Sequence, residues 1–100
     1  MGVRTSINTE SENVLLMKIL GNANRQKILW IVFGAKKDLC VNEISELAHI
    51  SQSLASHQLA YLSAYGVVEG HRMGQTMCYM PAKSELSSKL IKVLKVLSNK

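Results

Sequence analysis

The sequence has few of the residues on which secreted proteins and most enzymes depend. It contains two cysteines, one proline, five aromatic residues and seven Asp and Glu residues. Two cysteines are too few for the disulfide framework of a small secreted protein. There is no phosphate-binding glycine loop, and no Ser or Cys has an obvious His and third partner. We therefore expect neither an enzyme nor a bound cofactor.

Long apolar runs are also lacking. No run approaches the roughly 18 residues that span a bilayer, and the N-terminus has no apolar signal core. These absences predict a cytoplasmic protein without a membrane partner.

Positive charge and apolar residues are what the chain does have. Twelve Lys and Arg against seven Asp and Glu give a net charge of +5, which favours an anionic partner such as nucleic acid. With 47% hydrophobic residues, 100 residues predict one ordered small domain with a modest core, to which a dimer interface would add burial.

Two apolar helices are expected first. Thr9 and Glu12 have capping-box spacing before an apolar run that stops at Gly21, which predicts a flexible arm at 1–9 and a helix at 10–20. Asn22 predicts the cap of a second helix, which is apolar on nearly all sides and should be central.

The middle of the chain has helix-turn-helix spacing. Residues 39–41 predict a short strand, and Asn42 and Ser51 predict the caps of two short helices within residues 42–65. Next, "VVEGHR" and "TMCYM" flank Gly74 and predict a β-hairpin, or wing, at residues 67–80. An apolar stripe predicts a last helix at 84–98. The predicted fold class is mainly α with a small β-hairpin, a winged helix-turn-helix of order α-α-β-α-α-β-β-α in a single domain.

The helix after Ser51 has an unusual polar face. At about 100° per residue, one arc is apolar, and the other contains Gln52, Ser53, Ser56, His57, Ala60 and Ser63. Exposed helix surfaces usually carry Lys and Glu, and this one carries neither. Short hydrogen-bonding side chains let a helix lie close to base edges in the major groove. A merely solvated face is the alternative, but a tight turn precedes this helix, and a hairpin follows it whose His71, Arg72 and Gln75 can reach the DNA backbone or minor groove.

Residues 50–79 resemble the ArsR/SmtB family of dimeric bacterial repressors. The segment "ISQSLASHQLAYLSAYGVVEGHRMGQTMCY" is close to the family pattern LSQSxVSxHLxxLxxAGLVxxxRxGxxxxY, and the resemblance extends over residues 14–80. It implies DNA contacts through Gln52, Ser53, Ser56 and His57, which the helical arc selects independently. It also implies a homodimer formed by the helices at 10–20 and 84–98, which would read double-stranded DNA with an imperfect palindrome.

The metal sites familiar in that family are not matched. One lies in the motif ELCVCDL, where this chain has "DLCVNEI", so Cys40 matches the first cysteine and Asn42 replaces the second. A neutral amide is a poor ligand for soft metals. The other site uses Asp and His pairs on the last helix, and residues 84–98 contain neither. The sequence therefore assigns no residue to a metal site.

Cys40 and Cys78 suggest a sensor of another kind. A winged helix normally pairs its short first strand with the second hairpin strand, which would bring the two cysteines within disulfide range. Thiol oxidation would then twist the wing. Alternatively, both are packed, inert thiols, or a one-residue register shift separates them.

Three interpretations therefore remain open. The first is a sequence-specific DNA-binding repressor that responds to thiol oxidation. The second is a metal-responsive repressor that uses Cys40. The third is a winged-helix interaction module that binds protein or RNA.

Overall fold

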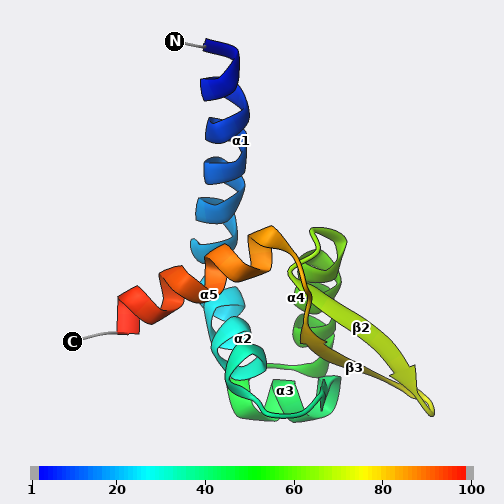
Figure 1. Ribbon diagram of the computed structural model, residues 1–100. Helices are drawn as coiled ribbons and strands as arrows, with labels where there is room; N and C mark the ends of the chain where they lie inside the picture. Colours follow the sequence, from blue (N-terminus) through cyan, green and yellow to red (C-terminus); the bar gives the residue numbers. More distant parts are fainter. Residues whose placement is uncertain (1–2, 99–100) are drawn as a thin grey trace.

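A computed structural model describes the backbone of residues 3–98 and the side chains of residues 12–98. The elements are α1 (Val3–Leu20), α2 (Ala23–Gly34), β1 (Leu39–Cys40), α3 (Val41–Ala48), α4 (Gln52–Ala64), β2 (Val68–Met73), β3 (Thr76–Pro81) and α5 (Glu85–Ser98) (Figure 1). The three strands form one antiparallel sheet in the order β1-β3-β2. The predicted order of elements and the winged helix-turn-helix fold are confirmed.

The first helix is longer than predicted. It begins at Val3, so residues 3–9 are helical and do not form the predicted arm; Met1 and Gly2 lie outside the described residues. No glycine or proline interrupts residues 3–20, and Glu12, the expected capping residue, instead accepts a hydrogen bond from Lys89 Nζ on α5 at 2.8 Å. That hydrogen bond to Glu12 raises the pKa of Lys89 above its ordinary value and links α1 to α5.

Helices α2, α3 and α4 begin at hydrogen-bonding caps. The backbone N–H of Arg25 donates to Asn22 Oδ1, and that of Leu54 donates to Ser51 Oγ, each at 3.0 Å, so both predicted caps are confirmed. The prediction for α3 is wrong: its first residue is Val41, and Asn42 is not its cap. The Glu43 carboxylate accepts the Cys40 backbone N–H at 2.9 Å, and the helix is capped at Cys40, two residues earlier than the sequence suggested.

The core surrounds α2, as predicted. This helix contacts α1, α3, α4 and β3, and its Ile28, Leu29 and Val32 are buried. Figure 1 shows α1 projecting upward from this core and the hairpin extending from its opposite side. Trp30 is an exception to the all-round burial, because 42% of it is exposed.

Two glycines shape the wing. Gly74 has φ +66° in the two-residue connection between β2 and β3, the left-handed conformation that its position in the turn predicted. Gly70 lies opposite Tyr79, and a Cβ at Gly70 would lie 2.6 Å from the Tyr79 ring. The missing side chain lets the largely buried tyrosine pack across the sheet.

Within residues 3–98, no helix combines the length and the apolar character needed to cross a bilayer.

Candidate nucleic-acid interface

The second helix of the helix-turn-helix, α4, presents its polar face to solvent. Ala55, Leu59 and Leu62 are buried against the core. All six residues of the predicted polar arc are exposed: Gln52, Ser53, Ser56, His57, Ala60 and Ser63. Their predicted exposure is confirmed. Helix α4 contributes no Lys, Arg, Asp or Glu to this surface.

Behind this face, Arg25 attaches α4 to the corner between α1 and α2. Its Nη1 donates to Gln58 Oε1 at 3.1 Å, its Nη2 donates to the Lys18 carbonyl at 2.7 Å, and its Nε donates to the Ile19 carbonyl at 3.2 Å. The guanidinium carbon also lies 4.4 Å from the centre of the Tyr61 ring. Gln58 is 7% exposed. This network holds α4 on the core through Gln58 and Tyr61, which are not part of the exposed polar face.

The sequence interpretation missed both members of this contact. The one available signal was Gln58, a polar residue placed between Ala55 and Leu59 on the buried side of the helix. A buried amide requires a hydrogen-bonding partner. The partner is 33 residues away, so no local spacing identifies it.

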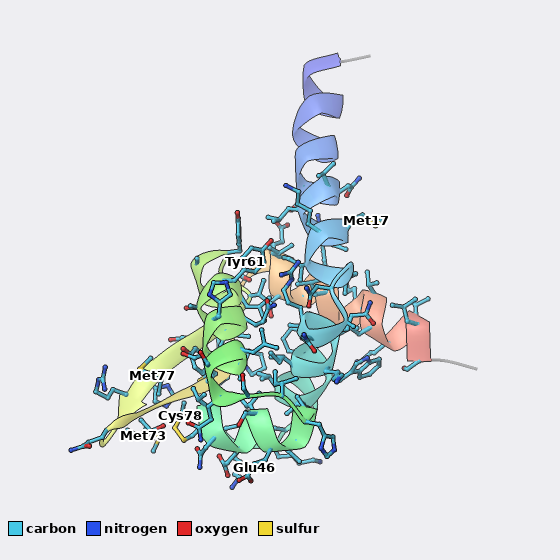
Figure 2. All side chains as sticks on the ribbon, turned by 180° about the vertical axis from the view of Figure 1, so that it is seen from behind. Met17, Glu46, Tyr61, Met73, Met77 and Cys78 are labelled. Carbon is cyan, nitrogen blue, oxygen red and sulfur yellow. A yellow bond between two sulfur atoms is a disulfide. The ribbon has the colours of Figure 1, made fainter. Side chains whose placement is uncertain are left out.

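The wing carries the other three predicted DNA contacts. Arg72 and Gln75 are exposed close to the hairpin turn, beyond the end of the helical core in the direction of Met73 (Figure 2). His71 lies nearer the base of the wing, where its Nε2 forms an ion pair with Asp38 Oδ2 at 2.7 Å. A DNA contact by His71 remains a prediction, but the structure already gives its side chain a partner.

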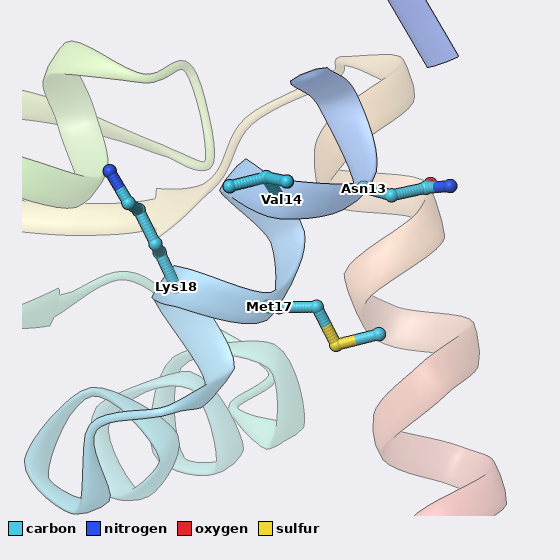
Figure 3. Close-up of a pocket in the computed structure, with 4 residues that line it drawn as sticks. All are labelled: Asn13, Val14, Met17 and Lys18. Carbon is cyan, nitrogen blue, oxygen red and sulfur yellow. The ribbon is translucent and has the colours of Figure 1, made fainter. Parts of the chain in front are cut away.

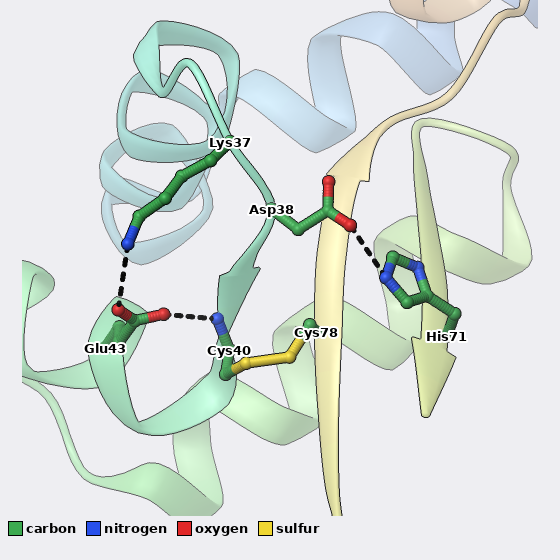
Figure 4. The surroundings of a disulfide bond; sticks show 6 residues. All are labelled: Lys37, Asp38, Cys40, Glu43, His71 and Cys78. Carbon is green, nitrogen blue, oxygen red and sulfur yellow. Dashed lines mark hydrogen bonds and ion pairs between the residues drawn. A yellow bond between two sulfur atoms is a disulfide. The ribbon is translucent and has the colours of Figure 1, made fainter. Parts of the chain in front are cut away.

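A disulfide joins Cys40 of β1 to Cys78 of β3 (Figure 4). The two residues are direct register partners, so the proposed strand pairing is confirmed and the register alternative is wrong. Their Cα atoms lie 3.7 Å apart, closer than the roughly 4.5 to 5.5 Å expected for an opposed pair. Since Cys40 directly precedes α3, the bridge connects the helix-turn-helix to the wing.

Apolar side chains are exposed at the opposite end of the molecule. On α1, Val14 and Met17 are 53% and 67% exposed, and they line a shallow groove with Asn13 and Lys18 (Figure 3). On α5, Val96 and Leu97 are also mostly exposed. These are the two helices that the family resemblance assigned to dimerisation.

Comparisons with known proteins identify relatives of this domain. The family model described as "Bacterial regulatory protein, arsR family" matches residues 22–69, from the cap of α2 to the start of β2. The putative arsenical resistance operon repressor ArsR of Halobacterium salinarum is 36% identical over 67 residues, which are 67% of this chain and 52% of that protein.

Two further similarities concern HlyU of Vibrio cholerae. The sequence described as "Transcriptional activator HlyU" is 28% identical over 88 residues, 88% of this chain and 80% of that protein. The solved structure of its reduced form superposes with a TM-score of 0.80 at 25% identity, covering 97% of this chain and 100% of that one. The chain thus spans about half of the archaeal repressor and most of the Vibrio protein.

Proposed function

Since the chain belongs to the ArsR family of winged helix-turn-helix regulators, we propose that it is a sequence-specific DNA-binding repressor of transcription. The observation that carries this proposal is the exposed, uncharged face of α4. It is formed by short donors and acceptors on a helix that follows a tight turn. One relative is named a repressor and another a transcriptional activator, and the proposed direction follows the repressor, to which the chain is more nearly identical (36% against 28%). A regulator of transcription would act in the cytoplasm.

In this proposal α4 enters the major groove. Gln52 can pair with adenine through both its amide donor and its carbonyl acceptor, and Ser53, Ser56 and His57 can reach base edges or phosphates. No long charged side chain on this face keeps the helix away from the bases. Arg72 and Gln75 of the wing would contact the backbone or minor groove, with His71 at the base of the wing.

The protein would bind as a homodimer. The exposed apolar side chains of α1 and α5 fit an interface formed by residues 10–20 and 84–98. A two-fold axis there would place two copies of α4 about 34 Å apart, one helical turn of DNA, so the operator would be an imperfect palindrome.

The disulfide would make DNA binding sensitive to oxidation. It ties β3 of the wing to the residue that precedes α3, so the oxidised wing cannot move independently of the helix-turn-helix. A wing that must follow the DNA backbone then docks less well. We propose that oxidation releases the operator.

A comparison of redox states tests this regulation. Oxidation is expected to lower operator affinity between about 5-fold and 150-fold, the usual range for coupling between two sites. Cys40→Ser should bind with the affinity of the reduced wild type under both conditions. An equal response to oxidant in wild type and Cys40→Ser would show that the bridge is not the sensor.

Titration of duplex DNA from the chain's own promoter region tests the function itself. Against a scrambled duplex of the same length, we expect preferential binding that weakens linearly as the logarithm of salt concentration rises. Binding without preference for the promoter duplex would instead favour an interaction module for protein or RNA.

A further inference from the structure

Arg25 connects α4, the helix that we assign to base recognition, to the last turn of α1. Its Nη2 and Nε donate to the carbonyls of Lys18 and Ile19, at 2.7 and 3.2 Å. Its Nη1 donates to Gln58 Oε1 on α4 at 3.1 Å. The last carbonyls of a helix lack partners within that helix, and a guanidinium presents its N–H groups as a rigid planar fork. One side chain of α2 therefore joins α1 directly to α4.

On α4, the contact lies behind the residues that we assign to the bases. Gln58 is 7% exposed, and it directly follows Ser56 and His57, whose side chains are exposed. Three positions further along, the centre of the Tyr61 ring lies 4.4 Å from the guanidinium carbon of Arg25, which adds a cation–π contact. Arg25 thus holds the inner side of the turn whose outer side would face DNA.

This contact constrains the helix in a way that apolar packing does not. Ala55, Leu59 and Leu62 bury the inner face of α4. Hydrophobic burial has no preferred direction, whereas a hydrogen bond is restricted in both distance and angle. The bond between Arg25 and Gln58 therefore limits rotation of α4 about its own axis.

On α1, the contact lies at the helix that we assign to dimerisation. Met17 is 67% exposed, and it lines the shallow groove of α1 together with Val14 and Lys18 (Figure 3). The Lys18 carbonyl is one of the two that Arg25 binds. Two hydrogen bonds in series, from Arg25 to α1 and from Arg25 to α4, thus connect the proposed dimer helix to the proposed DNA-binding face.

We propose that Arg25 is a positioning residue that sets the relative placement of the two α4 helices in the dimer, and thereby the half-site spacing that the protein accepts. In a two-fold dimer a tilt of α4 against α1 occurs in both copies, so it changes the separation of the α4 helices twice over. One base pair more or less between the half-sites shifts them by about 3.4 Å and turns them by about 35°. An α4 that is held by Arg25 does not follow such a shift.

This inference rests on the proposed DNA-binding function and adds to it a determinant of specificity that contacts no base. A position between two elements does not by itself demonstrate that they are coupled, so the decisive quantity is the interaction of Arg25 with Gln58 in a double-mutant cycle.

Binding to synthetic duplexes of different half-site spacing tests the proposal. Selection from random duplexes with the wild-type chain first yields the palindrome that it binds most tightly, and its half-sites are then moved apart or together by one base pair. The wild type should bind the selected spacing at least about 5-fold more tightly than either altered one, the lower end of the usual coupling between two sites. Arg25→Met and Gln58→Leu should each bring this factor close to one, and the double variant should lose no more than either single variant.

Two matched variants separate positioning from a loss of stability. Gln26→Leu removes a hydrogen bond from the same turn of α2 to the Leu20 carbonyl of α1, a bond that does not involve α4. It should keep the wild-type preference for spacing. Gln58→Glu retains an oxygen acceptor for Arg25 and should keep that preference as well. All variants should bind a duplex with one half-site as the wild type does, because the exposed face of α4 is unchanged.

Wild-type spacing preference in both Arg25→Met and Gln58→Leu, or an equal loss of preference in Gln26→Leu, would overturn the proposed role of Arg25. So would a wild type that selects a palindrome but binds all three spacings equally. A wild type that selects no common sequence would instead contradict the proposed function, so the two failures are distinguishable.

Discussion

At the scale of single residues, two arginines of this basic chain have different surroundings. Arg25 donates three hydrogen bonds inside the fold and faces the Tyr61 ring, so its charge is used to hold α4 in place. Arg72 is exposed near the tip of the wing. The net charge of +5 therefore indicated an anionic partner, but it did not show which basic side chains would contact that partner.

Replacing Arg72 with alanine should weaken binding to every duplex by a similar factor. A phosphate contact carries no base information, so its loss should lower the slope of log affinity against log salt by about 1 and leave the preference for the operator unchanged. Equilibrium titrations at several salt concentrations measure the slope.

Lys36→Ala is the matched control, because it removes the same charge from an exposed position between α2 and β1, outside the proposed DNA and dimer contacts. If both variants lower the slope equally, the effect of Arg72 is one of overall charge and the wing does not contact the backbone.

At the scale of elements, local sequence signals located α2, α4 and the hairpin well. Asn22 and Ser51 cap their helices as expected, and Gly74 adopts the conformation that its turn requires. The start of α3 was misplaced because the helix is capped at Cys40, whose backbone N–H is accepted by the Glu43 carboxylate, and Asn42 lies inside the first turn. Glu12 was misread as a capping residue because its partner, Lys89, lies 77 positions away.

Reduction of the Cys40–Cys78 bridge should lower the free energy of unfolding by about 4 kcal/mol, since the bridge closes a loop of 38 residues in the unfolded chain. Urea denaturation of the oxidised and reduced wild type measures this difference. Cys40→Ser should unfold with the stability of the reduced chain in either buffer. An unchanged midpoint on reduction would contradict a bridge that restricts the unfolded state.

At the scale of the whole molecule, a single chain leaves several apolar side chains exposed to solvent. Val14 and Met17 of α1 and Val96 and Leu97 of α5 are mostly exposed. Periodicity predicted an apolar stripe on α5, and Leu90 and Leu94 of that stripe are indeed buried. It could not predict which apolar residues pack within the chain and which remain available to a second copy, because that division depends on tertiary packing.

Met17→Glu should shift the protein toward monomer, because a carboxylate buried in an apolar interface loses its hydration without gaining a partner. Sedimentation equilibrium measures the change in mass. Met73→Glu makes the same substitution at an exposed methionine of the wing and should leave the dimer intact. A Met17→Glu chain that remains dimeric would place the interface elsewhere.

The most direct test of base recognition by α4 is the ratio of affinities for the operator and for a scrambled duplex, measured for wild type, Gln52→Ala and Ser56→Ala. Each variant should lose roughly 1 to 3 kcal/mol of operator binding with little change in binding to the scrambled duplex, so the ratio falls. Ser88→Ala, an exposed serine of α5, should keep the wild-type ratio. An unchanged ratio in both α4 variants would contradict the assignment of this face to DNA.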